Sequence, residues 1–499
     1  MKAKFWLTKK WLLIFPILFL SVMEAKAEVQ LSDTLSVTGL LRQELAVNTA
    51  EKNPNNGTQA DRNSIKLSRS FFHTEWTYEP NDTFKVFSKV KVISDQTQGL
   101  DNNLNDYDAF PLATPRYGTY LRATNDSEFN VEMSELYAEV SLGNLWLRLG
   151  KQQIVWGEVI GGRILDQINP LDQSWHLTLE PEEFENVRIA EWALRGRYEF
   201  SQWTGALQWL RDFYLEGFVN PGDISPTISP VNGSPYNLKA PASPVFKIRE
   251  EDRRGDMEFG FRIGGSVGQF AGTLNYLSLY TDSGFWESRA PLSPGPPSPT
   301  NPFPTTVSYP RTDMYGASLN YAFPYPINTT VTYEGIYSPD EPYYDKASAL
   351  PLIRTAHTLK QAIIFARNTF VLPRPIAAMS IQFQYMNFQI WDNDQIKVTP
   401  APFSSGSSTT NNNIDGDQHI IVLSLSQKLF KGDLITLSFQ AIYDLDDAYQ
   451  IKPGFTYKPG DHWVFDIYGA FLGGTESRPG RLGYLSWNDE VFGRITYQF

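Results

Sequence analysis

Hydrophobic and polar residues alternate along nearly the whole chain, and a period of two is the signature of β-strands. Residues 491–499 (VFGRITYQF) show it clearly, and residues 435–444 and 190–200 repeat it with wide apolar side chains on one face. A tilted transmembrane strand needs roughly 9–11 residues. The pattern therefore predicts an all-β chain whose strands cross a membrane, with a soluble all-β protein as the alternative.

The connections between the predicted strands alternate between short turns and long polar loops. The long loops are 48–63, 96–128, 156–187, 214–255, 281–311, 339–357, 391–417 and 472–488. Outer-membrane barrels have this layout, with tight turns on the periplasmic side and long loops outside. The flanks of these loops predict a transmembrane antiparallel up-and-down β-barrel of about 18 strands. About 16 strands is the alternative, because the connection at 446–447 is short where an external loop is expected. The Pro-rich stretch 291–310 is not expected to join a sheet.

The chain contains no cysteine, which excludes disulfides, thiolate metal sites and cysteine nucleophiles. A closed barrel stabilises such a chain by other means, because every backbone N–H and C=O in lipid has to be paired within the protein. None of the five histidines belongs to an H-E-x-x-H pattern or has a histidine four residues away. We therefore expect no metal site and no cofactor.

The first residues have the composition of a secretory signal peptide. Lysines precede an apolar run at 11–22, and Ala25-Lys26-Ala27 is a small-residue cleavage site. The run is too short for a transmembrane helix, which needs roughly 20 residues. We predict a signal peptide over 1–27 with cleavage after Ala27, one barrel domain over 28–499, and a location in the bacterial outer membrane.

Net charge and the C-terminus bear on the partners. The net charge is −12, and removal of the lysine-rich signal peptide makes it more negative. This argues against nucleic-acid binding, which relies on a basic surface. Outer-membrane lipid and lipopolysaccharide are the expected partners, since acidic loops can bridge to lipopolysaccharide through divalent ions. The terminal Tyr497-Gln498-Phe499 resembles the assembly signal of bacterial barrels, which implies that Tyr497 and Phe499 contact the barrel assembly machinery. The oligomeric state stays open.

The strand register that turns apolar side chains toward lipid turns the other face toward the lumen. Basic residues follow this inward face: Lys85, Lys89, Lys91, Arg148, Arg195, Arg197 and Arg262. A charge on the lipid face would cost roughly 2–4 kcal/mol near the midplane, which favours the inward register. Acidic residues share the face: Glu135, Glu139, Glu191 and Glu199. A wet lumen with mixed charges is therefore the alternative to a basic wall.

Residues 151–175 (KQQIVWGEVIGGRILDQINPLDQSW) begin at a strand end and continue into a segment that fits neither strand nor helix. They open the third external loop, 156–187. The glycines permit sharp bends, Asn169-Pro170 forces an extended residue, and the tryptophans supply large apolar bodies that a free external loop does not need. By analogy with the third loops of porins, we predict that this loop folds into the lumen. The expected constriction residues are Glu158, Arg163, Asp166, Asp172, Arg148, Arg195 and Arg197.

Three groups of residues form a pattern here: Gly150-x-Gln152, Trp156-Gly157-Glu158 and Asp166-x-x-Asn169-Pro170-x-Asp172. This pattern resembles the signature of a large outer-membrane barrel family of unknown function, which is related to alginate-export and porin-type barrels. The resemblance implies a porin-like outer-membrane protein that moves hydrophobic or bulky organic compounds. It implies no enzymatic role and no function for any single residue of the pattern.

The charged residues of the segment have three interpretations. The acidic ones could face Arg148, Arg195 and Arg197 across the pore, where a transverse field acts strongly because the dielectric is low. The same charges could instead pair with one another and with backbone groups, and so hold the loop in place. Glu158 and Asp166 could also form an acid/base pair, which would need perturbed pKa values and a substrate pocket.

These features lead us to expect a channel for small or bulky organic solutes, with anionic, hydrophobic or amphipathic compounds as candidates. One alternative is a barrel that serves an inner-membrane transporter in export or lipid trafficking. The other is an outer-membrane hydrolase, for which His73 and Glu75 share an inward face. The sequence has no G-x-S-x-G motif, so we expect no enzyme and no catalytic residues.

Overall fold

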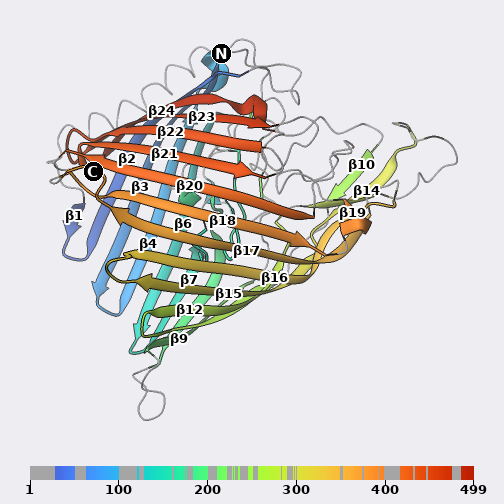
Figure 1. Ribbon diagram of the computed structural model, residues 1–499, viewed down its shortest axis with the longest axis horizontal. Coiled ribbons are helices and arrows are strands. Elements are labelled where there is room, and N and C mark those ends of the chain that lie inside the picture. The colour runs from blue at the N-terminus through green and yellow to red at the C-terminus, as the bar shows by residue number, and fades with distance from the viewer. Residues whose placement is uncertain are drawn as a thin grey trace.

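The fold was taken from a computed structural model of the chain (Figure 1). It describes residues 28–50, 63–100, 121–122, 128–159, 162–174, 176, 184–200, 211–221, 227–228, 230, 234–236, 246–250, 257–282, 284–288, 296, 298, 300–348, 352–373, 376–391, 393–397, 416–430, 433–445, 448–474 and 485–499. The predicted signal peptide and the connection at 446–447 lie outside these residues.

A closed antiparallel barrel of 18 strands forms the body of the protein. The strands are β2 (Leu35–Asn48), β3 (Ile65–Asn81), β4 (Phe84–Asp95), β6 (Phe129–Leu142), β7 (Leu145–Gln152), β8 (Glu191–Glu199), β9 (Arg211–Asn220), β11 (Glu258–Val267), β12 (Phe270–Tyr280), β15 (Arg311–Phe323), β16 (Thr329–Asp345), β17 (Ile353–Thr369), β18 (Met379–Ile390), β20 (Asp417–Leu429), β21 (Ile435–Asp444), β22 (Ala448–Tyr457), β23 (Trp463–Gly474) and β24 (Glu490–Gln498). Each strand pairs with the next one in this order, and β24 pairs with β2. The predicted up-and-down barrel of about 18 strands is confirmed, and the alternative of 16 is wrong.

Smaller elements accompany the barrel. The short strands β1 (Val29–Ser32), β5 (Leu121–Arg122) and β19 (Ile396–Lys397) pair with barrel strands. A separate three-stranded sheet of β10 (Phe246–Glu250), β14 (Phe303–Ser308) and β13 (Phe285–Ser288) projects beyond one end of the barrel (Figure 1). The described helical turns are α2 (Thr97–Leu100), α3 (Phe184–Val187), η3 (Asn393–Gln395) and η5 (Ser486–Asn488). Among the described residues, no helix has the length and apolar character needed to cross a membrane.

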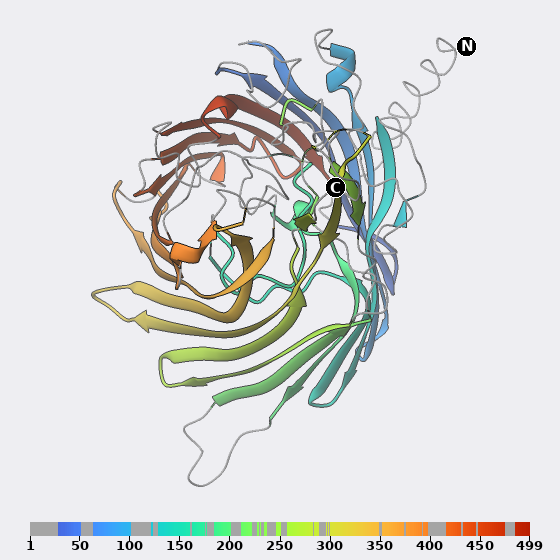
Figure 2. The ribbon, with the colours of Figure 1, turned by 90° about the vertical axis from the view of Figure 1, so that its right-hand side faces the viewer.

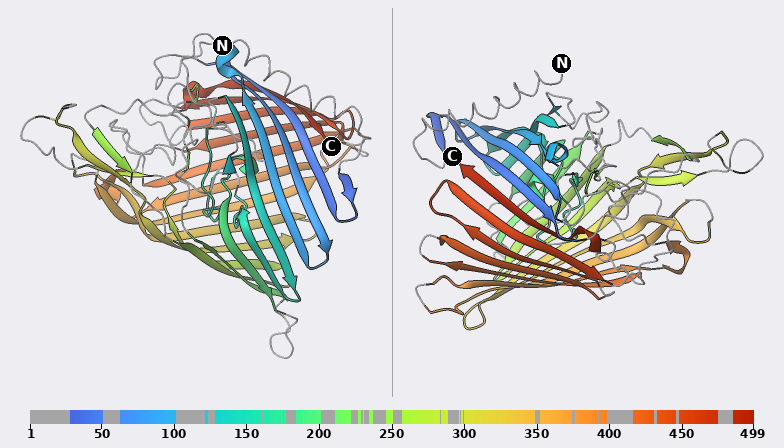
Figure 3. Two further views of the ribbon diagram at one scale, coloured as in Figure 1. Left: turned by 180° about the vertical axis from the view of Figure 1, so that it is seen from behind. Right: turned by 90° about the horizontal axis from the view of Figure 1, so that it is seen from above.

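The barrel closes where the last strand meets the first long strand. Figure 3 shows β24, in red, beside β2, in blue. Beyond the paired strands, Gly39 and Phe499 exchange two backbone hydrogen bonds of 2.8 and 2.9 Å. A Cβ on Gly39 would lie 2.6 Å from the Phe499 ring and 2.7 Å from the backbone oxygen of His73, so only glycine fits at this position. The terminal residue is therefore part of the closure itself.

The two faces of the wall differ as a transmembrane barrel requires. On β11, the side chains of Phe259, Phe261 and Ile263 are exposed on the outer face, whereas Glu258 is buried and Arg262 half-buried on the inner face. Large exposed hydrophobic residues recur at alternate positions on the other strands. An outer face of this kind can contact lipid, and the polar side chains are left to line the interior.

Three predicted loops overlap strands of the structure. Residues 214–220, predicted to open a loop, belong to β9, because an inward-facing strand residue can be polar and Glu216 is one. The ends of the predicted loop 339–357 likewise belong to β16 and β17. The Pro-rich stretch 291–310 does join a sheet through β14, where Pro304 lies at the start of the strand and one missing N–H is tolerated.

The segment that follows β7 packs against the inner wall. We call residues 153–159 and 162–174 the inner segment. Its buried residues Ile154, Ile164 and Leu165 form one hydrophobic cluster with inward-facing side chains from β8, β9, β12, β16, β17, β18, β20 and β21. In the view of Figure 2, the teal chain of this segment lies within the ring of strands. The largest apolar core of the described chain is therefore built between this segment and one side of the barrel.

Candidate functional site

The inner segment is fastened first by Trp156. Its indole Nε1 donates a hydrogen bond of 3.0 Å to Oε1 of Glu216 on β9. The same ring packs edge-on against Phe218, with 5.5 Å between ring centroids, and the guanidinium of Arg262 lies 5.1 Å from its centre. The buried indole thus has both an apolar contact and a partner for its N–H, as buried tryptophan requires.

Glu216 is the junction of this contact. Glu216 is 0 % exposed, and its carboxylate also accepts hydrogen bonds from Nε of Arg195, at 2.9 Å, and from Nη2 of Arg262, at 2.9 Å. A buried carboxylate is tolerated only when it is paired and hydrogen-bonded. Because its donors come from β8, β11 and the inner segment, one side chain joins three parts of the chain.

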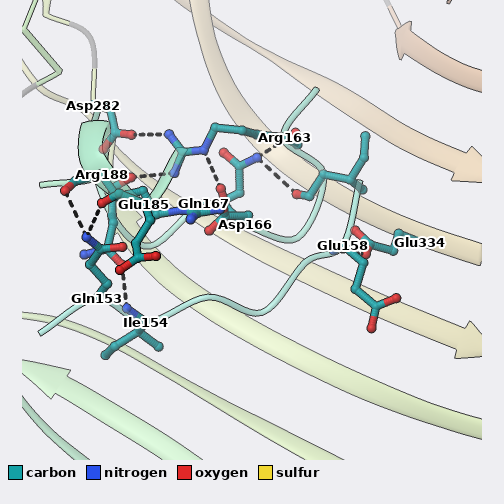
Figure 4. A network of polar contacts seen from close by, with 12 residues as sticks. Gln153, Ile154, Glu158, Arg163, Asp166, Gln167, Glu185, Arg188, Asp282 and Glu334 are labelled. Atoms are coloured by element: carbon teal, nitrogen blue, oxygen red, sulfur yellow. Dashed lines mark hydrogen bonds and ion pairs between the residues drawn. The ribbon is translucent and has the colours of Figure 1, made fainter. Parts of the chain in front are cut away.

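Asn169 closes the inner segment on itself. Its Oδ1 accepts a hydrogen bond of 2.7 Å from the backbone N–H of Ile154, and its Nδ2 donates one of 2.8 Å to the backbone oxygen of Ile189. Both ends of the loop are therefore held by one buried amide. Arg163 adds a hydrogen bond from Nη2 to the Asn169 backbone oxygen at 2.6 Å, and an ion pair of 3.1 Å with Asp282 (Figure 4).

Most predicted charges of the segment have local partners. Asp166 pairs with Arg188 through two hydrogen bonds, of 3.0 Å from Nε and 2.7 Å from Nη2 (Figure 4). Asp172 accepts a hydrogen bond of 3.1 Å from the backbone N–H of Ser174, which caps its own turn. Asp166 and Arg163 thus tie the segment to residues outside it, and Asp172 stabilises a turn within it, as in the interpretation in which the charges hold the loop.

Glu158 differs from the other charges of the segment. Its side chain is exposed, and Figure 4 shows its carboxylate pointing away from the other labelled residues. Its backbone N–H donates to Oε1 of the buried Glu334 on β16. This approach depends on Gly157, because a Cβ there would lie 2.8 Å from the backbone nitrogen of Asp166 and 3.1 Å from Glu334 Oε2.

The predicted arginines of the wall pair with carboxylates of the wall itself. Arg148 Nε donates to Glu139 at 2.8 Å, and Arg197 forms an ion pair of 3.1 Å with Glu199. Arg195 is held by Glu216, as described above. None of these ion pairs includes an acidic residue of the inner segment. The structure thus places the arginines and the charges of the segment in separate networks.

The predicted lysines lie on the inner wall near α3. Lys89 contacts Glu75 at 3.2 Å and Glu185 at 2.5 Å, and Lys91 donates to the backbone oxygen of Asn186 at 3.2 Å. Burial alone would raise the pKa of Glu185, but the Lys89 ammonium lowers it below its usual value. These lysines hold α3, the helical turn that leads from the loop into β8.

Lys85 and Arg262 have different surroundings from these two lysines. Lys85 forms an ion pair of 3.0 Å with Glu79, and the two side chains are 35 % and 53 % exposed. Arg262 belongs to the Glu216 junction. The predicted lumen-wall residues therefore divide among three separate groups of contacts.

A second anchor lies where the segment continues to His176. The ring Nε2 of His176 lies 2.6 Å from Oε1 of Glu490 on β24, and the hydroxyl of Tyr236 donates to Oε2 of the same carboxylate at 2.9 Å. Lys66 on β3 lies 3.4 Å from that carboxylate. Two long loops therefore converge on one buried carboxylate beside the closure of the barrel.

The candidate hydrolytic pair is part of an ion-pair group. His73 Nε2 lies 3.1 Å from Glu75, and the Glu75 carboxylate also binds Lys89 at 3.2 Å. Within the described part of the chain, no three His, Asp or Glu side chains are placed so that they could hold a metal ion. The Glu75 carboxylate is thus shared between His73 and Lys89 on the inner wall.

The sequence of residues 19–444 matches the profile of a protein family described as "Protein of unknown function (DUF1302)". The chain belongs to this family. No curated protein sequence matches the chain. Membership agrees with the expectation that the chain belongs to a family of unknown function.

Several solved structures resemble the barrel. OmpF of Salmonella typhi, in complex with daunomycin, has 12% identity and a TM-score of 0.40, with 95% of this chain and 100% of that chain covered. A BenF-like porin from Pseudomonas fluorescens Pf-5 has 9% identity and a TM-score of 0.49, with 93% and 98% covered. Wzi, a carbohydrate-binding β-barrel involved in capsule assembly in Escherichia coli, has 9% identity and a TM-score of 0.44, with 92% and 84% covered.

Two central carboxylates of these networks were not anticipated from the sequence of this family member. Glu216 lies in a stretch assigned to a loop, and Glu490 lies at the start of the last strand without a recognisable motif. One signal was available for Glu216, because Leu215 and Val219 alternate with it as an apolar outer face. Its arginine and tryptophan partners are not visible in the local sequence.

Proposed function

We propose that this protein is a channel of the bacterial outer membrane through which small or bulky organic solutes pass. The observation that carries the proposal is the packing of the inner segment against the inward side chains of one side of the barrel. Trp156 ties that segment to Glu216, which lies in the middle of β9. A solute crossing the barrel would therefore pass between the segment and the opposite wall.

The exposed carboxylate of Glu158 supports a role in selection. Glu334 accepts a hydrogen bond from the backbone N–H of Glu158 and so fixes the backbone at this position. The Glu158 side chain is exposed and can contact a solute. Arg148, Arg195 and Arg197 line another part of the wall. In a narrow passage of low dielectric, such charges act on solutes more strongly than in bulk water.

The location and assembly of the protein are parts of the same proposal. The signal peptide over 1–27 directs export with cleavage after Ala27, and Tyr497 and Phe499 present the final strand to the assembly machinery. Lipid and lipopolysaccharide surround the finished barrel. We propose no catalytic step, and we keep the relation to alginate-export-type barrels as a hypothesis based on the pattern at 150–172.

Single-channel recording in planar bilayers tests this function. Purified protein should give stepwise conductance, and a variant that lacks residues 158–172 should give larger steps because the passage is wider. Since the deletion could prevent folding, Glu158→Lys is the second variant. It should keep the conductance level and shift ion selectivity toward anions. Silent bilayers for the wild type and both variants would overturn the channel, and co-purification of an inner-membrane transporter would then favour the export alternative.

A further inference from the structure

An unfavourable arrangement of charge lies on the inner wall next to the inner segment. Arg148 on β7 stands directly opposite Arg195 on β8 in the strand register. Like charges at directly opposed positions destabilise a sheet. Arg148 has Glu139 as its partner, and Arg197, two residues further along β8, has Glu199. These pairs reduce the repulsion, and both guanidinium groups lie near the Trp146 ring, at 5.0 and 5.4 Å from its centre.

The carboxylates do not balance the arginines in number. Arg195 and Arg262 share the single carboxylate of Glu216, at 2.7 and 2.9 Å. We call Arg148, Arg195, Arg197 and Arg262 the arginine strip. Its four guanidinium groups face the three carboxylates of Glu139, Glu199 and Glu216. This part of the wall therefore carries one positive charge more than its ion-pair partners neutralise.

Aromatic rings lie beneath the guanidinium groups. Arg148 lies 4.1 Å from the ring centre of Tyr137 and 5.0 Å from that of Trp146. Arg197 lies 4.0 Å from the ring centre of Tyr214. A guanidinium over a ring has one face covered, and Glu139 takes up Nε and Nη2 of Arg148. A ligand would therefore meet the opposite face and the remaining N–H groups, through which Arg binds carboxylate and similar groups.

The arginines of the strip are partly accessible, and Arg197 is the most exposed of them. The side chains of Arg148 and Arg195 are 19 % and 16 % exposed, and that of Arg197 is 35 % exposed. Within the described residues, Nε of Arg197 has no hydrogen-bond partner. This nitrogen is itself covered, so a ligand would meet the exposed part of the Arg197 side chain, which is the most exposed of the strip.

We propose that the arginine strip binds organic anions that carry a flat apolar group. The anionic group would bridge the opposed guanidinium groups of Arg148 and Arg195 and relieve their repulsion. The flat group would pack against Tyr214 and the exposed face of Arg197. This inference rests on the proposed function, because it makes the strip the solute-binding wall of the channel and names the class of solute.

Calorimetry on the full-length mature protein in detergent tests binding without requiring conduction. The probes are 2-naphthoate, cyclohexanecarboxylate and benzylammonium. We expect 2-naphthoate to bind more tightly than cyclohexanecarboxylate, and benzylammonium not to bind. Arg148→Gln should weaken 2-naphthoate binding by about tenfold or more, which is the effect of losing one charge-assisted hydrogen bond. The double variant Glu139→Gln/Arg148→Gln leaves the net charge of the wall unchanged, and its affinity for 2-naphthoate should fall to a similar extent.

Lys85→Gln is the matched control, because it removes a positive charge of the inner wall that pairs with Glu79 outside the strip. It should leave the affinity unchanged. Equal affinity for 2-naphthoate and benzylammonium, or unchanged affinity in both Arg148 variants, would overturn the site. Conductance without 2-naphthoate binding removes the site and leaves the channel standing. Binding without conductance removes the channel and leaves the site.

Discussion

The indole N–H of Trp156 donates a 3.0 Å hydrogen bond to the fully buried carboxylate of Glu216. This contact joins the inner segment to β9, and the carboxylate in turn holds Arg195 and Arg262. A single acidic side chain thus supports both the position of the segment and the order of the neighbouring arginines.

Glu216→Ala should be strongly destabilising. Removal of the carboxylate leaves two partly buried guanidinium groups and one indole N–H without their partner, and loss of one member of a buried ion pair costs about 3–5 kcal/mol. Urea unfolding in detergent, followed by tryptophan fluorescence, measures the change. Glu199→Ala is the control, since that side chain is 65 % exposed and its ion pair should contribute little. Equal losses in the two variants would contradict the role of Glu216.

Trp156→Leu keeps an apolar side chain but removes the indole N–H and its ring contact with Phe218. Glu216 then loses one donor, at a cost of about 1–3 kcal/mol. The inner segment should become more mobile, and open-channel noise in bilayer recordings should rise. Trp192→Leu on the outer face of β8 is the comparison and should leave the noise at the wild-type level. Noise that is equal in all three proteins would argue against this anchor.

Gly157→Ala should displace the inner segment. The new Cβ would lie 2.8 Å from the backbone nitrogen of Asp166, and a backbone atom cannot move away as a side chain can. Limited proteolysis of the folded protein should cut the variant faster within the segment. The control is Gly460→Ala, because a Cβ at that glycine meets nothing within 4 Å. Unchanged cleavage in Gly157→Ala would show that the segment tolerates the contact.

Asn169→Asp should open the loop although the two side chains have the same shape. The carboxylate keeps the acceptor for Ile154 but loses the donor and places a negative charge against the backbone oxygen of Ile189. Because Asn169 is only 1 % exposed, water cannot relieve this repulsion. Hydrogen exchange measured by mass spectrometry should rise at Ile154 and its neighbours. The control is Asn144→Asp, in an exposed turn, which should leave hydrogen exchange at Ile154 unchanged.

The contact of Glu185 with Lys89 predicts a dependence on pH. The pKa of Glu185 is lowered in the folded protein, so its stabilising contribution is complete above the unfolded value of about 4.3 and is lost as the pH falls through the folded value. Glu185→Gln should therefore unfold at a slightly lower temperature than the wild type at pH 7, because a carboxylate that is 61 % exposed gains at most about 1 kcal/mol from its ion pair. The difference should vanish in strongly acidic buffer. A difference that persists there would mean that the charge of Glu185 is not its cause.

The period of two and the parity of the turns determined the barrel from sequence alone. A strand that crosses lipid has to pair all its backbone groups and present one apolar face, and both demands leave a local pattern that can be counted. The pattern weakens where inward residues are polar. For that reason 214–220 was assigned to a loop although it forms most of β9. The glycines and Asn169-Pro170 of the inner segment likewise indicated a shaped loop.

Only the tertiary structure decided which charges and donors meet. Trp156 and Glu216 are 60 residues apart, and His176 and Glu490 are 314 residues apart. Contacts of this kind depend on the stagger of the strands and on the closure of β24 with β2, neither of which has a local signature. The sequence showed that acidic residues of 151–175 and inward arginines exist in one lumen. The closed wall supplied these arginines with nearer carboxylates: Glu139 for Arg148, Glu199 for Arg197, and Glu216 for both Arg195 and Arg262. Residues on the same or a neighbouring strand lie closer than residues facing one another across the barrel.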